Sequence, residues 1–343
     1  MRAPFRDRLL QVPALLRGAL LVALLATLAA TGARAQAPGV SIEDLVSAVV
    51  QIKTFIDPEG RTVENLGRNR EGTGVVIDTN GLVLTIGYLM VEAHSAEIIT
   101  NDGTALPADV VGYDHDTGFG LLRATQPLKV RPLPLGRSGD TARGERALVV
   151  GFGGTSMLQP VHIVSKREFA GYWEYLLDEA IFTTPPHPRW SGAALINREG
   201  RLLGIGSLIV GDATGSGDGV PGNMFVPIDG LPPVMADLLS EGRASGPARP
   251  WIGITTDEIG GRLVVRRVTP GGPAERAGLR NGDVIQGIGG ESARGLADLY
   301  RKLWARGRAG TVIPLDITQD GATRRLDVTS INRRAHLKLK STF

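Results

Sequence analysis

Short apolar runs separated by turn residues dominate the chain between residues 75 and 226. Residues 74–77 (Gly-Val-Val-Ile) precede the turn Asp-Thr-Asn-Gly, and residues 82–84 (Leu-Val-Leu) follow it. Similar runs occupy residues 147–150 (Ala-Leu-Val-Val) and 202–206 (Leu-Leu-Gly-Ile-Gly). Short β-strands joined by tight turns at this spacing predict a sandwich or barrel architecture. Residues 211–222 are rich in Gly and Asp, which predicts a surface loop.

Helical periodicity is limited to a few short stretches outside this region. Ser41 begins a capping-box spacing over residues 41–44, which predicts a short helix there. Apolar residues at helical spacing run from Leu231 to Leu239. For this second helix we expect Asp229 as the N-cap and Gly242 as the end.

A second compact unit is expected after a linker. Residues 244–250 (Ala-Ser-Gly-Pro-Ala-Arg-Pro) have the composition of a linker. Beyond them, strand-like residues 263–268 and 283–288 flank a short helical signal at 273–278. An amphipathic helix follows, with one apolar face formed by Leu296, Leu299, Tyr300, Leu303 and Trp304. The pattern therefore predicts a separate α+β unit.

Both ends of the chain carry concentrated positive charge. Four arginines precede an apolar run at residues 18–30, which is followed by Ala33, Arg34 and Ala35. This arrangement predicts a secretory signal at residues 1–35 and export to the periplasm. The apolar run is shorter than the ~20 residues that span a bilayer, and an uncleaved anchor remains the alternative. We expect the basic tail, residues 331–343, to be solvated and frayed.

Composition excludes several function classes. The 343 residues are 42% hydrophobic and 21% charged, which is ordinary for a globular protein of about two domains. Residues 1–35 contain five Arg and one Asp, a net charge of +4. The formal charge of +3 for the whole chain therefore leaves the remaining residues near −1. Nothing therefore favours nucleic-acid binding. The absence of cysteine excludes disulfides, Cys-ligated zinc and a thiol nucleophile. No motif indicates a metal site or a cofactor.

Several landmarks occur in the order and spacing of one known family. They are residues 72–78 (Gly-Thr-Gly-Val-Val-Ile-Asp) with 81–85, 133–138 (Leu-Pro-Leu-Gly-Arg-Ser), 224–227 (Met-Phe-Val-Pro), 249–254 (Arg-Pro-Trp-Ile-Gly-Ile), and 273–279 with 281–285. Together they resemble the HtrA (Deg) family of periplasmic serine proteases. The resemblance implies a mainly β fold, with a trypsin-like double β-barrel at residues 40–230 and an α+β PDZ domain at 251–330. Residues 231–250 would form the helix and linker between them.

The resemblance also locates a catalytic triad that this chain lacks in part. Ser191 matches the nucleophile, but Tyr88 stands at the position of the His and Gly118 at that of the Asp. A phenol of pKa ~10 has almost no basicity at pH 7, and glycine cannot orient a base. Arg189 replaces a glycine whose backbone N–H normally faces the oxyanion. We therefore expect a pseudoprotease with little or no proteolysis.

Two alternatives remain open. In the first, the chain is an atypical serine endopeptidase that uses Ser191 with a relocated base. His187, four residues before Ser191, and His115, in the loop of Gly118, are the candidates for that base. In the second, the protein is a non-catalytic structural scaffold that does not bind C-terminal peptides.

The PDZ resemblance implies a peptide-binding site. Backbone N–H groups of the loop Trp251, Ile252, Gly253 and Ile254 would hold a C-terminal carboxylate while the peptide adds as a strand. The helix at residues 296–304 would form the other wall, with most of its apolar face in the core. The expected partners are peptides or protein C-termini, including unfolded envelope proteins or an active relative. A role in envelope protein quality control or its regulation follows, and the family's trimers suggest a homo-oligomer by analogy.

Overall fold

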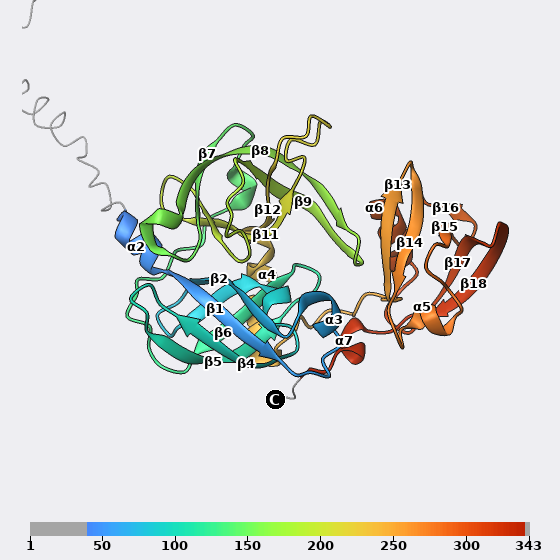
Figure 1. Cartoon of the computed structure of the whole chain (residues 1–343), viewed down its shortest axis with the longest axis horizontal. Coiled ribbons are helices and arrows are strands. Elements are labelled where there is room, and N and C mark those ends of the chain that lie inside the picture. Colours follow the sequence, from blue (N-terminus) through green and yellow to red (C-terminus); the bar gives the residue numbers. More distant parts are fainter. Residues whose placement is uncertain (1–39, 340–343) are drawn as a thin grey trace, which may run out of the picture. The chain divides into compact units, whose positions relative to one another are not determined.

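The computed structural model describes residues 40–339, so the expected signal sequence at residues 1–35 lies outside the described residues. The first six strands form a closed barrel with the order β1-β2-β3-β6-β5-β4 (Figure 1). Their bounds are β1 (Val49–Ile56), β2 (Asn69–Val76), β3 (Leu82–Ile86), β4 (Ala93–Ile99), β5 (Ala105–Tyr113) and β6 (Phe119–Ala124).

The next six strands form a second closed barrel, with the order β10-β11-β12-β9-β8-β7. Their bounds are β7 (Arg146–Val150), β8 (Leu158–Gly171), β9 (Tyr175–Thr184), β10 (Ala194–Ile196), β11 (Leu202–Val210) and β12 (Gly222–Pro227). Short helical turns lie between the strands of the two barrels or directly after the last of them. They are α3 (Val63–Leu66), η1 (Gly87–Leu89), η2 (Ser138–Asp140), η3 (Gly154–Met157) and η4 (Ile228–Gly230).

Neighbouring residues of the barrel strands pack into different cores. Val76 packs inside the first barrel and Val149 inside the second. The adjacent Val75 and Val150 both pack in the core that the two barrels share. Because side chains alternate along a strand, burial of both faces requires a continuous apolar run. This explains why β3 and β10, whose residues are all buried, are almost wholly apolar in the sequence, whereas the partly exposed β5 and β8 also carry polar residues.

The third sheet has the strand order β13-β14-β15-β17-β18, with β16 paired to β15. Its elements are β13 (Ile254–Ile259), β14 (Arg262–Val268), α5 (Pro273–Arg276), β15 (Val284–Ile288), β16 (Glu291–Ser292), α6 (Leu296–Ala305), β17 (Val312–Gln319) and β18 (Ala322–Thr329). α6 is the predicted amphipathic helix, and Leu299, Tyr300 and Leu303 are fully buried in the core of this sheet. The mainly β fold class, two barrels followed by an α+β unit, is confirmed.

The helix predicted after the barrels is present as α4 (Pro232–Glu241), and it ends at Gly242 as predicted. The expected N-cap is wrong, because Leu231 occupies that position without a side-chain bond. The carboxylate of Asp229 instead accepts hydrogen bonds from the backbone N–H groups of Ser138 (3.0 Å) and Gly139 (2.7 Å). Prolines in the first turn lack an N–H, so this helix start has fewer donors to satisfy.

The first helix forms as the capping spacing predicts. It is α2 (Ile42–Ser47), and the Ser41 hydroxyl accepts a hydrogen bond from the Asp44 N–H at 3.0 Å. Between residues 40 and 339, no helix has both the length and the apolar character needed to cross a membrane.

The basic tail is packed against the protein along its described length, which corrects the expectation of a solvated segment. It forms α7 (Arg333–His336), which Asn332 caps by accepting from the Arg334 N–H. The Arg333 guanidinium lies 2.6 Å from Nε2 of His115. The backbone N–H of Lys338 donates to the Glu92 carboxylate at 2.7 Å. Charged residues of the tail thus find partners in the first barrel, so repulsion between them does not keep it in solvent.

Candidate functional site

Tyr88 and Ser191 meet between the two barrels. Tyr88 lies in η1, directly after β3, and Ser191 lies in the loop between β9 and β10. The Tyr88 hydroxyl is 2.8 Å from Oγ of Ser191 and 2.9 Å from the carbonyl oxygen of Ser207 on β11. A phenol has one proton to donate. The hydroxyl can donate this proton to the Ser207 carbonyl, and its oxygen then accepts a hydrogen bond from the Ser191 hydroxyl.

Burial keeps the hydroxyl of Tyr88 protonated. Burial raises the pKa of Tyr88 to about 12, and the hydrogen bond with Ser191 opposes this only in part. The phenol therefore stays neutral at physiological pH, and a neutral phenol cannot accept the proton of a serine hydroxyl. Ser191 has a hydrogen-bond partner at this position but no base.

The space beside Gly118 is filled by a tyrosine. Gly118 lies in the loop between β5 and β6, and its carbonyl oxygen accepts from the Gly87 N–H at 2.7 Å. A Cβ atom on Gly118 would lie 2.9 Å from the hydroxyl of Tyr175. That hydroxyl donates to the carbonyl oxygen of Thr117 at 2.8 Å. A carboxylate-bearing residue at position 118 would therefore collide with a hydroxyl that is already hydrogen-bonded.

The loop before Ser191 uses its own histidine as an acceptor. The backbone N–H of Arg189 donates to Nδ1 of His187 at 3.1 Å, and Nε2 of His187 lies 3.2 Å from the carbonyl oxygen of Met157. Burial lowers the pKa of His187, so the ring is neutral with its proton on Nε2. In this conformation the Arg189 N–H faces the imidazole and is not free to stabilise an oxyanion.

His115 is bonded within a different cluster. Its Nδ1 lies 3.0 Å from the Tyr113 hydroxyl, and its Nε2 lies 3.3 Å from the carbonyl oxygen of Glu174. Burial and the nearby charge of Arg333 hold the pKa of His115 well below its ordinary value. Within residues 40–339, no hydrogen bond joins Ser191 to either His115 or His187.

Ser191 and Gly192 also form a backbone contact with Thr73 of the first barrel. The carbonyl oxygen of Ser191 accepts from the Thr73 N–H at 2.8 Å. Gly192 has φ +75°, and a Cβ atom there would lie 1.9 Å from the carbonyl oxygen of Thr73. Only glycine fits this contact without moving the backbone. Gly192 thus has a structural reason to be present that does not depend on catalysis.

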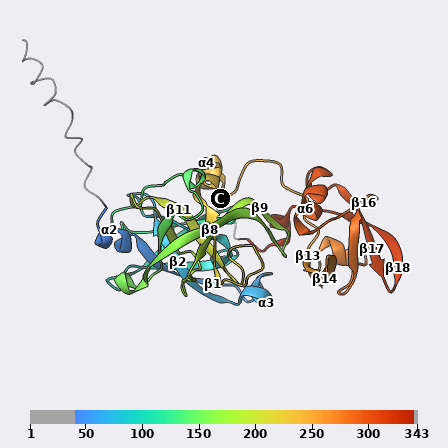
Figure 2. The same cartoon turned by 90° about the horizontal axis from the view of Figure 1, so that it is seen from above.

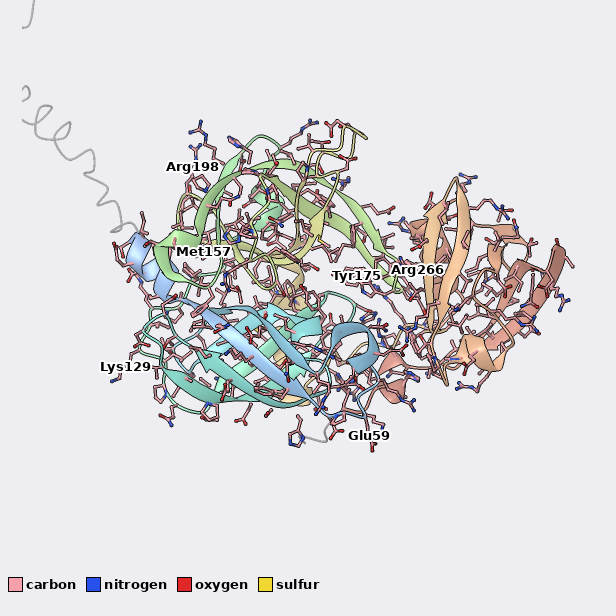
Figure 3. The ribbon with its side chains drawn as sticks, in the orientation of Figure 1. Glu59, Lys129, Met157, Tyr175, Arg198 and Arg266 are labelled. Carbon is pink, nitrogen blue, oxygen red and sulfur yellow. The ribbon has the colours of Figure 1, made fainter. Side chains whose placement is uncertain are left out.

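A cavity of about 630 Å³ opens beside Tyr88. Residues from both barrels and from the third sheet line it, including Tyr88, Trp190, Ser207, Tyr172, Trp173, Tyr175 and Arg266. Figure 3 labels two of them, Tyr175 and Arg266. The lining is mainly aromatic and aliphatic with a few cationic groups. Among the described residues, no group of three or more His, Asp or Glu side chains could hold a metal ion.

The loop predicted to bind carboxylates holds one. The backbone N–H groups of Ile252, Gly253 and Ile254 all donate to the side chain of Glu174, at 3.1, 2.7 and 3.0 Å. The N–H of Trp251 donates instead to the carbonyl oxygen of Ile331. Three of the four residues expected at this site therefore present donors to one carboxylate, and Trp251 is bonded elsewhere.

Sequence reasoning missed two participants, Ser207 and Glu174. Ser207 contributes only a backbone carbonyl, which leaves no mark on residue identity. Glu174 has a weak signal in the run Gly-Tyr-Trp-Glu-Tyr at residues 171–175. Three aromatic residues in one turn are unusual for a chain with 5% aromatics, and such a turn suggests a docked segment.

Comparison with known proteins gives two family matches. Residues 72–205 match the trypsin-like peptidase domain, and residues 250–329 match the PDZ domain. HhoA of Synechocystis sp. is 29% identical over 286 residues, which cover 76% of this chain and 69% of that protein. The periplasmic pH-dependent serine endoprotease DegQ of Escherichia coli is 27% identical over 276 residues, 75% of this chain and 58% of DegQ.

Solved structures give the same fold. The HtrA-type protease AlgW with a decapeptide superposes with a TM-score of 0.50 at 23% identity, covering 88% of this chain and 100% of that chain. The present chain spans less than two thirds of the length of DegQ. With the two barrels, the third sheet and the order of the two matched domains, the chain therefore combines a trypsin-like peptidase domain with a C-terminal PDZ domain and is similar in this to the HtrA/Deg serine proteases.

Proposed function

We propose that this protein is a catalytically impaired HtrA-like protein that binds peptides or protein C-termini through its PDZ domain. The observation that carries the first half is the hydrogen bond between Tyr88 and Ser191. A neutral phenol of pKa about 12 occupies the side of Ser191 where a serine protease needs a base. Gly118 and Arg189 add two further defects, one in orienting a base and one in stabilising an oxyanion.

Peptide binding is supported by the carboxylate loop. Three converging N–H groups at Ile252, Gly253 and Ile254 form a site for one carboxylate, and Gly253 has the positive φ of +83° that lets them converge. The related AlgW structure contains a decapeptide. We infer that a free C-terminal carboxylate is the group this loop recognises.

In the described part of the chain, neither His187 nor His115, the two candidates for a relocated base, is hydrogen-bonded to Ser191. Both nitrogens of His187 are hydrogen-bonded to the backbone of their own loop and of η3. His115 is bonded to Tyr113 and Glu174 instead. We propose that Ser191 keeps its hydroxyl as a partner of Tyr88, with no catalytic role. The scaffold alternative has no observation of its own in its favour.

The proposed setting is the periplasm, after removal of residues 1–35 as a signal sequence. The name of DegQ as a periplasmic protease supports this setting. We propose a barrel domain at 40–230, a helix and linker at 231–250 and a PDZ domain at 251–330. The proposed clients are unfolded envelope proteins or an active relative, and homo-oligomers are compatible with the family. The role would be regulatory or protective in protein quality control.

Two measurements test the loss of catalysis. Purified protein is incubated with casein and, separately, with a fluorophosphonate probe that labels activated serines, and a Ser191→Ala variant serves as the control. We expect no casein cleavage above that of Ser191→Ala and no labelling at Ser191. Casein cleavage that Ser191→Ala abolishes would overturn the proposal.

A further inference from the structure

The tip of the β8–β9 hairpin lies against the edge of the PDZ sheet. We call residues 171–174 the hairpin tip, and Figures 1 and 2 show β8 and β9 extending from the second barrel to β13 and α6. The backbone N–H of Thr256 on β13 donates to the carbonyl oxygen of Tyr172 at 2.9 Å. The tip is thus bonded through its main chain to an edge strand of the PDZ domain.

The Glu174 carboxylate is completely enclosed in the carboxylate loop. Its Oε1 accepts from the N–H groups of Gly253 and Ile254, and its Oε2 accepts from that of Ile252. Glu174 is 3% exposed and has φ +58°, a left-handed conformation that is uncommon for a glutamate. Glu174 is the third residue of the three-residue turn 172–174, the position at which such hairpin turns place a left-handed residue. The turn presents its carboxylate to the three N–H groups.

The spacing of these contacts is that of an added strand. Ile254 and Thr256 are alternate residues of β13, and their partners Glu174 and Tyr172 are alternate residues of the tip. In strand addition the edge strand binds alternate residues of the incoming segment. Tyr172, Trp173 and Glu174 therefore occupy the place of the last residues of a bound peptide, with a side-chain carboxylate at the end.

The helix on the other side of the groove also holds the tip. The Tyr300 hydroxyl of α6 donates to the carbonyl oxygen of Gly171 at 2.8 Å and accepts from the Glu174 N–H at 3.2 Å. Arg301, the next residue of α6, pairs with Glu168 and Asp178 on the two strands of the hairpin. Both walls expected for a peptide groove, β13 and α6, are thus occupied by one internal segment.

We propose that the hairpin tip is an internal ligand of the PDZ domain, in which the Glu174 carboxylate stands in for a C-terminal carboxylate. This inference rests on the proposed function, because it requires the loop to be a peptide site. A peptide with a free C-terminus binds only after the tip leaves the groove. Its apparent affinity is reduced by the fraction of molecules in which the tip is undocked.

Release of the tip also changes the cavity beside Tyr88. Tyr172 and Trp173 line that cavity, and the Trp173 ring stacks on Tyr175 with centroids 5.5 Å apart. A C-terminus that displaces the tip removes both side chains from the cavity wall.

The experiment compares peptide affinities of full-length variants. The probe is a synthetic peptide with the sequence of residues 167–173 followed by a terminal valine, with a free carboxylate or an amide at its end. The variants are Glu174→Ala and Glu179→Ala. Glu179 lies on the same hairpin but pairs with Lys166 of the neighbouring strand. We expect Glu174→Ala to bind the free-acid peptide about tenfold or more tightly than the unchanged chain, because docking no longer competes. Glu179→Ala should bind like the unchanged chain, and the amide should bind weakly.

Equal affinity of the unchanged chain and Glu174→Ala for the free-acid peptide would overturn the internal-ligand inference and leave peptide binding intact. If no variant binds the peptide, the proposed function fails for this probe, and amide hydrogen exchange decides the inference separately. In that case, faster exchange at Ile252, Gly253 and Ile254 in Glu174→Ala than in Glu179→Ala supports the docked tip. Equal exchange rates in the two variants refute it.

Discussion

At the scale of single residues, Tyr88 satisfies the polar groups between the barrels without supplying a base. Its hydroxyl reaches both Ser191 and the Ser207 carbonyl, so no polar group there is left unpaired. Leaving a buried hydroxyl or carbonyl unsatisfied costs about 1–3 kcal/mol, which favours a residue long enough to span both. The phenol therefore has a stabilising role at this position that does not depend on catalysis.

A single reversion at Tyr88 should not produce a protease. In Tyr88→His the imidazole has no carboxylate to orient it, because Gly118 has no side chain and the Tyr175 hydroxyl occupies the adjacent space. In Ser-His-Asp triads, loss of the carboxylate lowers turnover by about 10⁴. We expect casein cleavage by Tyr88→His to stay at the level of Tyr88→His with Ser191→Ala.

A triple variant with Tyr88→His, Gly118→Asp and Tyr175→Phe isolates the oxyanion defect, because it supplies a base and a carboxylate and removes the colliding Tyr175 hydroxyl. We expect cleavage to remain low here as well while the Arg189 N–H is bonded to His187. Robust, Ser191-dependent cleavage by the single Tyr88→His variant would contradict the assignment of Gly118 as a defect.

Gly192 should be required for stability whether or not the site is active. Gly192→Ala combines a positive φ with a Cβ atom 1.9 Å from the Thr73 carbonyl oxygen. Gly103→Ala is the matched control, since Gly103 has φ +87° and open space around its Cβ. We expect urea unfolding to show a loss of about 3 kcal/mol for Gly192→Ala and about 1 kcal/mol for Gly103→Ala. Equal losses would show that strain alone, and not the contact with Thr73, selects glycine.

At the scale of elements, the β8–β9 hairpin places the buried side chain of Glu174 against the PDZ domain. Desolvation raises the pKa of Glu174 to about 7, although three backbone N–H groups and the charge of Arg333 oppose the rise. The other titratable groups that face it are Tyr300 and His115, and both are neutral near pH 7. A raised pKa in the docked state means that docking is favoured by protonation.

Docking of the tip should therefore weaken with rising pH. The stabilisation is fully present below the ordinary pKa of 4.5 and is lost as the pH rises through about 7. After correction for intrinsic exchange, we expect the opening of the Ile252, Gly253 and Ile254 amides to increase about tenfold or more between pH 5.5 and 8. Glu174→Gln keeps an acceptor but does not titrate, so its opening should be independent of pH. A pH response of the same size in Glu174→Gln would assign the effect to another group.

The sequence predicts elements better than the contacts between them. The barrel strands follow from short apolar runs between turns, most clearly for β3 and β10, which are buried on both faces. The α4 cap was missed because Asp229 satisfies donors of η2, which lies more than 80 residues away in the chain. The bonds of Glu174 to the carboxylate loop join residues 78–80 positions apart. No local pattern encodes such contacts.

At the scale of the whole molecule, the C-terminal tail contacts the tip of the β8–β9 hairpin through Arg333. The Arg333 guanidinium contacts the His115 ring and donates to the carbonyl oxygen of Trp173 at 3.3 Å. His115 in turn lies 3.3 Å from the carbonyl oxygen of Glu174. The C-terminal helix, the first barrel and the hairpin tip thus meet around one cationic side chain. Release of the tip would therefore remove one partner of this arginine, the Trp173 carbonyl, and leave the His115 contact in place.

Removing that arginine should loosen the tip. In Arg333→Ala, Trp173 loses a donor and His115 loses a partner, and about 1 kcal/mol of lost hydrogen bonding predicts roughly fivefold tighter binding of the free-acid peptide. Arg198→Ala, a substitution at an exposed turn of the second barrel, is the matched control and should leave affinity unchanged. Because Arg333 acts only by holding the tip, it should add little in a Glu174→Ala background, where the tip is already free. Effects of Arg333→Ala and Glu174→Ala that simply add in a double-mutant cycle would mean that the tail affects peptide binding by a route that does not pass through the hairpin.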